Sequence, residues 1–502
     1  MDFLKRHKFE FFVLSALILI YFATRFYSIL SLPIFTDEAI YIRWAQIAKQ
    51  DANWRFISLT DGKQPMFIWL MMISLRFIQD PLLAGRVVSV GAGFLTLIGM
   101  YFLGREIFKN NKIGLISSAL YVIFPMALVY DRMALYDSLV GTFAVWSLLL
   151  IIILARKVRM DASLILGMVT GGGVLTKTSA FFSIYLLPFS LLLFNWGEKG
   201  IKSKLLKWVG LGFISVALTY SFYSILRLSP FFHIIDEKNT IFVYPLKDWL
   251  QHPLEFFILN CHAFWDWTNL YLTWPLLLLA LLSFFVARSF TKEKITLFLW
   301  FIIPIAALGL FGRTLYPRFI FFMILPLLPL IAYSLVNIYP RFKRVYLFII
   351  FCFLVFILAF KTDYLILTDF AKSNIPSSDT QQYLTRWPAG GGIKKSIEFF
   401  EKEAKKGKIY IATEGTFGLL PYAFEIYLIK NPNIQIEGYW PMEDVIPAKV
   451  IEKSKEVPTY FVFYQPCSSC KKTGIAPITW NLKPVLQMES GINSFTSIYR
   501  IK

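Results

Sequence analysis

Several acidic residues stand at the ends of long apolar runs, where charge is costly and commonly functional. Asp37 and Glu38 follow the first run in PIFTDEAIY, and Asp137 opens another in RMALYDSLVG. Carboxylates in such places can act as a general base or bind a divalent cation. Acidic residues also cap helix N-termini, so Thr36 or Asp37 can cap a helix that starts near Ala39, and Asp137 can cap the next apolar helix. Both interpretations stay open.

Basic residues stand in comparable positions. Lys63 lies in TDGKQPMFIW, and Lys177 follows GGGVLT. Arg313, Tyr316 and Arg318 lie together in FGRTLYPRFIFF. These cations can hold a lipid phosphate or another anion, or they can snorkel and contact lipid headgroups. GGGVLTKT is not a nucleotide-binding loop, because a threonine stands where that loop needs glycine.

Two further groups carry weaker signals. Asp131 and Arg132, in VYDRM, are secondary candidates that also fit a solvated turn, as Arg313 fits headgroup contact. Cys467 and Cys470 form a single CxxC, which favours a structural disulfide or unreactive thiols over a redox or zinc site. The four histidines form no HExxH motif, which argues against a zinc enzyme.

The elements that carry these residues are mostly apolar helices. Of the 502 residues, 57% are hydrophobic, and the mean hydropathy is +0.58. This composition exceeds the roughly 45–50% apolar content of soluble proteins. A spanning helix needs about 20 apolar residues, and eleven candidate spans can be read, two of them short. They are 9–30, 82–103, 113–130, 138–154, 163–175, 180–195, 205–226, 273–287, 295–311, 317–338 and 345–361.

The placement of charge predicts the orientation. Every segment on one side of the eleven spans, from 1–8 to 339–344, carries three or four Lys or Arg residues. Basic segments remain on the cytoplasmic side, so we expect a cytoplasmic N-terminus in the plasma membrane. The formal charge of +19 is then an orientation signal rather than a nucleic-acid footprint, and no nucleic-acid partner is expected.

The opposite side receives two long loops, 31–81 and 228–272, and the tail 362–502. Within the first loop, 39–50 and 66–78 read as helices, the second short enough to lie in the interface. In the tail, 408–415 and 458–466 read as buried strands, and 394–407 as an amphipathic helix ending at a glycine C-cap. A turn-rich linker, 373–392, precedes them. We therefore predict a polytopic α-helical domain, 1–361, and an extracytoplasmic α/β domain, 362–502.

Five motifs in register resemble those of membrane glycosyltransferases of the GT-C type. They are TDEAIY, DGKQPMFIWL, RMALYDSLVGTF, VLTKTSAF and PRFIFFMILPLLPL. The protein mannosyltransferase and aminoarabinose transferase superfamily is the most similar branch. The resemblance covers about 1–361 and implies the GT-C fold. It also implies transfer of a sugar from a polyprenyl-phosphate carrier to a protein, glycolipid or glycan acceptor at the outer membrane face.

The resemblance also implies residue roles. Asp37 would be the catalytic base with Glu38 beside it, and Asp137 would contact metal or sugar. Lys63 matches the lysine of the family's Lys-Pro-Pro signature, although Gln64 stands here before the proline. The expected phosphate-binding residues are Lys63, Lys177, Tyr316 and Arg318.

The expected ligands of a divalent cation are Asp37, Glu38 and Asp137. Mg²⁺ or Mn²⁺ suits this oxygen set better than zinc, and no nucleotide cofactor is expected. Direct displacement by an acceptor hydroxyl predicts inversion at the sugar carbon. A lipid or solute transporter would favour broken helices and internal repeats, and we see no repeat. A non-catalytic scaffold would not need acidic and basic residues gathered at one membrane face.

Overall fold

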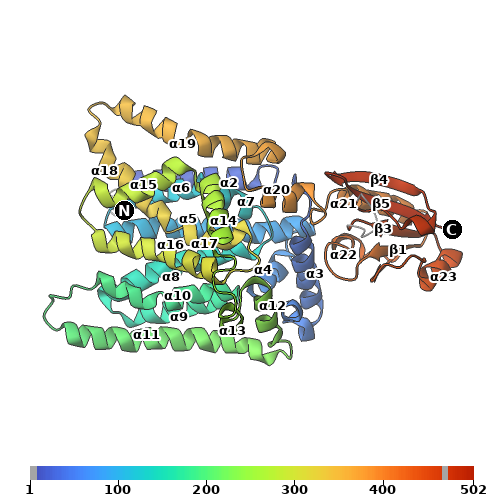
Figure 1. The fold of residues 1–502 in the computed structure, drawn as a ribbon, viewed down its shortest axis with the longest axis horizontal. Helices are drawn as coiled ribbons and strands as arrows, with labels where there is room; N and C mark the ends of the chain where they lie inside the picture. The colour runs from blue at the N-terminus through green and yellow to red at the C-terminus, as the bar shows by residue number, and fades with distance from the viewer. Residues whose placement is uncertain (1–7, 466–472) are drawn as a thin grey trace. The chain divides into compact units, whose positions relative to one another are not determined.

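The computed structural model describes residues 8–465 and 473–502 (Figure 1). Contacts divide the chain into two compact units. The helical unit comprises Met1–Tyr27, Phe56–Phe67 and Val88–Pro376, and the mixed unit comprises Ser28–Arg55, Ile68–Val87 and Ser377–Lys502. The tail from Ser377 onward therefore groups with two pieces that include most of the first long loop, and the division does not follow a single boundary near residue 361. Cys467 and Cys470 lie outside the described residues.

The helical unit carries the long apolar helices, because a chain in lipid must satisfy its backbone hydrogen bonds internally. Within the described residues, six helices have the length and composition to cross a membrane. They are α2 (Lys8–Phe26), α5 (Pro81–Phe108), α8 (Tyr136–Lys157), α11 (Ile201–Ser224), α16 (Thr291–Phe311) and α19 (Val345–Thr368).

Two bent pairs raise the number of candidate spans to eight. Helices α14 (Phe257–Leu272) and α15 (Trp274–Val286) meet at 98° around Thr273, which has a φ of +66°. The second pair, bent by 49°, joins η6 (Pro317–Ile320) and α17 (Phe321–Ile324) to α18 (Leu327–Ile338), with a proline at the break.

The other predicted spans are helical but short or broken. α9 (Met160–Val174) and the helical run Thr178–Leu193 stay below spanning length. The predicted span 113–130 divides into α6 (Asn111–Val122) and α7 (Pro125–Tyr130), because a proline begins the second piece. All eleven segments are thus largely helical, but the number of eleven spans is not confirmed.

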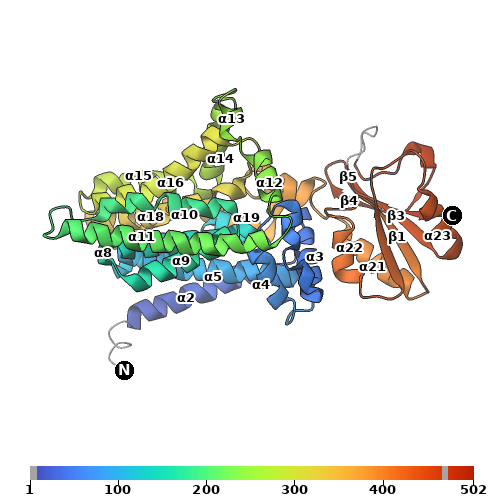
Figure 2. The same cartoon turned by 90° about the horizontal axis from the view of Figure 1, so that it is seen from below.

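Glycines let some of these helices approach closely. Helices α8, α9 and α11 lie side by side in Figures 1 and 2, and α9 contacts both of the others. A Cβ at Gly171 would stand 2.7 Å from the ring of Phe222, and one at Gly172 would stand 2.7 Å from the ring of Phe143. The glycine run before Lys177 therefore permits close helix packing, as in other membrane helices.

The mixed unit contains a five-stranded sheet with the order β2-β1-β3-β5-β4. The strands β1 (Ile409–Glu414), β2 (Ile434–Tyr439) and β3 (Thr459–Phe463) are parallel. The strands β5 (Ser494–Ile501) and β4 (Pro484–Gly491) continue the sheet antiparallel. The helices of this part are α21 (Ile393–Ala404), α22 (Tyr422–Leu428) and α23 (Ala448–Glu456). The predicted α/β pattern is present, but α21 ends at Ala404, so the predicted glycine C-cap at Gly407 is wrong.

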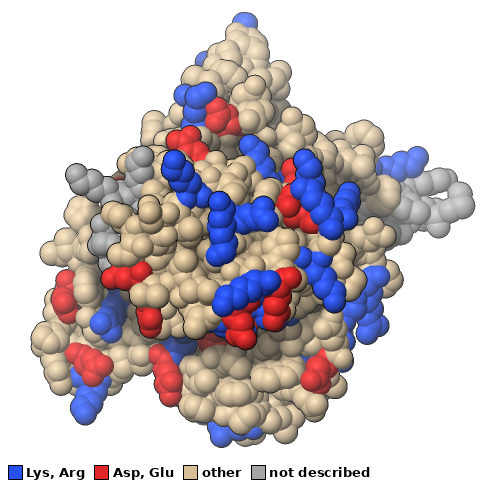
Figure 3. Space-filling view, turned by 90° about the vertical axis from the view of Figure 1, so that its right-hand side faces the viewer, with Lys and Arg blue, Asp and Glu red and all other residues tan. Residues whose placement is uncertain are grey.

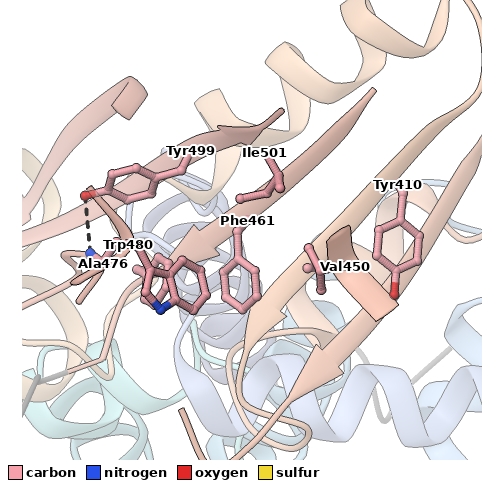
Figure 4. Packing of buried hydrophobic residues seen from close by; sticks show 9 residues of the cluster. Tyr410, Val450, Phe461, Ala476, Trp480, Tyr499 and Ile501 are labelled. Carbon is pink, nitrogen blue, oxygen red and sulfur yellow. Dashed lines mark hydrogen bonds between the residues drawn. The ribbon is translucent and has the colours of Figure 1, made fainter. Parts of the chain in front are cut away.

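Aromatic side chains form much of the core beside this sheet. Figure 4 shows Phe461, Trp480 and Tyr499 in one buried cluster, where the Ala476 backbone N–H donates to the Tyr499 hydroxyl at 3.2 Å.

Acidic and basic side chains are interspersed on the face seen in Figure 3, without a broad field of one sign.

One carboxyl group is buried at the end of β1. Glu414 accepts hydrogen bonds from the backbone N–H groups of Gln465 and Tyr464, at 2.8 and 2.9 Å. Burial nevertheless raises the pKa of Glu414 above its ordinary value of 4.5.

Candidate active site

An ion pair joins two of the predicted site residues in the helical unit. Asp137 lies in the first turn of α8, and its Oδ1 accepts a hydrogen bond from Lys177 Nζ at 2.8 Å. Leu135 is the N-cap of α8, so the expectation that Asp137 caps this helix is wrong. The Asp137 side chain is 7% exposed and the Lys177 side chain 29%, which leaves the cation open to a ligand.

One aromatic residue of the FGRTLYPRFIFF motif, Phe319, lies against Lys177. Lys177 Nζ lies 4.3 Å from the ring centroid of Phe319, and the Arg318 guanidinium lies 5.4 Å from the ring of Tyr316. Lys177 stands between two short helices, and burial lowers its pKa. Asp137 opposes this shift, whereas the charges of Arg318 and Lys63 add to it.

Lys63 belongs to a second charged group that includes a residue the sequence reasoning missed. Asp61 Oδ2 lies 3.3 Å from Lys63 Nζ, and Asp61 Oδ1 accepts from Lys238 Nζ at 2.6 Å. Lys238 lies on α12 (Ile234–Phe242), in the second long loop. No sequence pattern distinguishes Lys238 from the other lysine of that loop. Its role depends on its contact with Asp61, which lies 177 residues earlier in the chain. We call Lys63, Lys177, Lys238 and Arg318 the cation cluster.

The glutamine that departs from the family signature connects the two halves of this cluster. Gln64 Nε2 donates to Thr178 Oγ1 at 2.7 Å, and the Met66 backbone N–H donates to the Leu175 carbonyl at 3.0 Å. These bonds hold the segment that bears Lys63 against the segment that bears Lys177.

The adjacent acidic pair divides into two different environments, both within the mixed unit. Glu38 is fully buried and binds Arg86 through both carboxylate oxygens, at 2.8 and 2.9 Å. It also accepts from the Phe35 backbone N–H at 3.0 Å, at the start of α3 (Thr36–Gln50). These bonds make Glu38 a positioning residue, while its neighbour Asp37 stays partly exposed in the same first turn. Phe35 is the N-cap, so neither Thr36 nor Asp37 caps this helix as expected.

The secondary candidates lie outside the cation cluster. Asp131 is buried and contacts Ser138 Oγ at 2.8 Å, Tyr121 at 3.1 Å and Arg25 Nε at 3.4 Å, so the expectation of a solvated turn there is wrong. Arg132 donates to the Tyr27 carbonyl at 2.7 Å. Arg313 lies 5.4 Å from the ring centroid of Tyr244. Through these contacts, Asp131, Arg132 and Arg313 hold neighbouring helices and loops together.

The described residues do not fit the expected divalent cation. Among residues 8–465 and 473–502, no group of three or more His, Cys, Asp or Glu side chains could hold a metal ion. Of the three proposed ligands, Asp137 already pairs with Lys177, and Glu38 pairs with Arg86. A metal would have to displace a cation from two of the three carboxylates, so no step below is routed through a metal.

Comparison with known families gives one match. Residues 62–223, about a third of the chain, match the family model of dolichyl-phosphate-mannose-protein mannosyltransferase. This region contains Lys63, Asp137 and Lys177. No curated protein matches the chain.

Solved structures match over most of the chain at low sequence identity. ArnT from Cupriavidus metallidurans bound to undecaprenyl phosphate has a TM-score of 0.57 and 12% identity, over 98% of both chains. Archaeal oligosaccharyltransferase AglB from Archaeoglobus fulgidus, in complex with an inhibitory peptide and a dolichol-phosphate, has a TM-score of 0.52 and 14% identity. That match covers 91% of this chain and 69% of the other. A structure of the Archaeoglobus oligosaccharyltransferase with Zn and sulfate has a TM-score of 0.50 and 14% identity, over 90% and 67%.

The apolar helices and these matches together identify an integral membrane protein. They confirm the predicted resemblance to the mannosyltransferase and aminoarabinose transferase superfamily: this chain has the GT-C fold of membrane glycosyltransferases.

Proposed function

We propose that this protein is a glycosyltransferase that moves a sugar from a polyprenyl-phosphate carrier to an acceptor hydroxyl at the outer membrane face. The cation cluster carries this proposal. It brings together four cations, of which Lys63 and Lys238 pair with Asp61 and Lys177 pairs with Asp137, and Lys177 keeps 29% of its side chain exposed, where a phosphate group can bind. The undecaprenyl phosphate of the ArnT structure and the dolichol-phosphate of the AglB structure support the same class of donor.

The proposed chemistry follows the resemblance to GT-C enzymes, which assigns Asp37 as the base. Asp37 accepts the proton of the acceptor hydroxyl, and the acceptor oxygen attacks the anomeric carbon on the face opposite the phosphate. The bond from that carbon to the phosphate oxygen breaks, and the electron pair leaves on the phosphate. Lys177, Lys63 and Arg318 stabilise the negative charge that develops there. The displacement inverts the anomeric centre and uses no nucleotide.

Asp37 is the better candidate for the base of its acidic pair. Its side chain is partly exposed, whereas both oxygens of Glu38 are held by the buried guanidinium of Arg86. We propose that Glu38 acts through Arg86 to fix the first turn of α3, and that Asp37 touches the acceptor. The proposed orientation places these residues and the tail on the extracytoplasmic side, opposite the basic segments.

The direct test is turnover with a panel of labelled polyprenyl-phosphate sugars, using the purified chain in lipid nanodiscs. We expect loss of label from one carrier and transfer to a protein, glycolipid or glycan acceptor, with the product in the inverted configuration. Absence of turnover for every donor, together with binding of another solute, would support transport and contradict the proposal.

A matched pair of variants tests the base. Asp37→Asn should abolish transfer while the protein elutes as a folded species in gel filtration. Asp236→Asn, which changes an exposed carboxylate of the second long loop, should leave transfer unchanged. Full activity of Asp37→Asn would show that another group accepts the proton.

A further inference from the structure

A groove of about 580 Å³ lies between α5 and α8, away from the cation cluster. Phe102 of α5 and Trp146 and Ile153 of α8 line its apolar part. The ring centroids of Phe102 and Trp146 are 6.1 Å apart, and Phe102 keeps 39% of its surface exposed. An exposed apolar wall along two spanning helices is a surface that lipid chains cover.

The indole of Trp146 is held in place rather than loosely packed. Its Nε1–H donates to the Leu95 carbonyl at 3.0 Å, across to α5. A Cβ at Gly99 would stand 3.1 Å from that nitrogen and 2.9 Å from Val145, so only glycine permits this approach. The apolar wall is therefore a defined part of the fold.

The same groove ends in basic side chains where both helices finish. Arg105 stands in the last turn of α5, Lys109 follows it, and Lys157 ends α8. The groove's carboxylate, Glu106, is already paired, since it binds Lys109 and lies 3.4 Å from Arg156. Across residues 8–465 and 473–502, no carboxylate lies within ion-pair distance of Arg105 or Lys157. Three cations and one carboxylate leave an excess of two positive charges.

We propose that this groove binds an anionic phospholipid, with the phosphate on Arg105 and Lys157 and an acyl chain along Phe102, Trp146 and Ile153. The arrangement matches how a lipid is built, because apolar contacts run along the spans and the cations stand at their ends. Basic pockets between membrane helices bind anionic headgroups in this way. A small soluble anion would leave the apolar wall unused. In the orientation proposed above, the lipid belongs to the cytoplasmic leaflet.

Native mass spectrometry of the purified full chain can test the site. The protein is incubated with phosphatidylglycerol, cardiolipin or phosphatidylcholine, and the retained lipid is counted. We expect the anionic lipids to be retained over phosphatidylcholine. The double variant R105A/K157A should weaken this retention about thirtyfold, the value expected for two basic residues near a membrane surface. The control K202A/K207A removes two exposed lysines of α11, at the same predicted membrane face, and should retain the lipid.

A second variant separates headgroup binding from general charge attraction. Ile153→Trp fills the apolar part of the groove and leaves every cation in place, so it should also reduce retention of the anionic lipids. Unchanged retention of the anionic lipids in R105A/K157A, or an equal loss in K202A/K207A, would each overturn the proposal. The readout is lipid stoichiometry, so these results are independent of whether the protein transfers a sugar.

Discussion

Removal of the Lys177 ammonium should weaken binding of the carrier phosphate more than it weakens the fold. The change Lys177→Met keeps most of the side chain's length and its contact with the Phe319 ring, but it removes the charge. In the structure, Lys177 Nζ lies 2.8 Å from Asp137 Oδ1 and retains access to solvent, with 29% of its side chain exposed.

The expected magnitude follows from the two interactions that are lost. A hydrogen bond to a charged group contributes about 1.5–3 kcal/mol, which corresponds to about a 10- to 150-fold loss in affinity for the phosphate. The ion pair with Asp137 is only partly buried, so its loss should cost less than the roughly 3–5 kcal/mol of a fully buried pair. The protein should therefore stay folded.

The assay is binding of a polyprenyl phosphate to the detergent-solubilised protein, measured alongside its thermal unfolding. The matched variant is Asp137→Asn, which removes the competing carboxylate and keeps the cation. Affinity for the phosphate should fall in Lys177→Met and stay equal or rise in Asp137→Asn. Both variants should show a similar, modest fall in melting temperature.

The opposite pattern would contradict this role of Lys177. If Lys177 served only to neutralise Asp137, Lys177→Met would bind the phosphate as tightly as the wild type while losing stability. Equal loss of affinity in both variants would show instead that the ion pair positions the site as a unit.

Three further changes probe the surrounding structure. Arg86→Met should destabilise the protein by about 3–5 kcal/mol, because it leaves the Glu38 carboxylate buried without its cation; a melting temperature equal to the wild type would contradict this. Gly93→Ala should lower the free energy of unfolding by about 1–3 kcal/mol through overpacking, since its Cβ would stand 2.3 Å from the buried hydroxyl of Tyr21. The control Gly91→Ala meets nothing within 4 Å and should leave the stability unchanged. The raised pKa of Glu414 means that its contribution to stability is present below its ordinary value of 4.5 and is lost as pH rises through the folded-state pKa. As pH rises through this pKa, the melting temperature of the wild type should therefore fall relative to that of Glu414→Gln. Parallel plots of melting temperature against pH for the two proteins would contradict this prediction.

The sequence predicted local structure well where one physical requirement dominates. Apolar runs in a membrane must be helical, so every predicted span appears as helix. Length was less certain, because Pro125 divides a segment whose composition alone reads as continuous. The helix Phe257–Leu272 lies where a loop was predicted. In the tail, the buried strands around Ile411 and Phe461 were predictable, whereas β2 and β4 carry mixed burial and were not recognised. The strand β5 was also missed, although most of its side chains are buried.

The candidate site was predictable by residue type and only partly by role. Charges at the ends of apolar runs identified Asp37, Lys63, Asp137 and Lys177 without any structure. The same signal could not distinguish Asp37 from its neighbour Glu38, because the difference lies in the partner, Arg86. The same signal could not identify Lys238, because only its ion pair with Asp61 in the folded chain distinguishes it from other loop lysines.

Composition and charge placement alone indicate a helical membrane protein and the residues that carry charge at its membrane boundaries. Which of these charges pair with each other depends on the folded chain. Asp137 pairs with Lys177 across 40 residues, and Glu38 pairs with Arg86 across 48. The physical reason is that the cost of a buried charge is local and can be read from composition, whereas its compensation depends on a partner that folding brings from elsewhere in the chain.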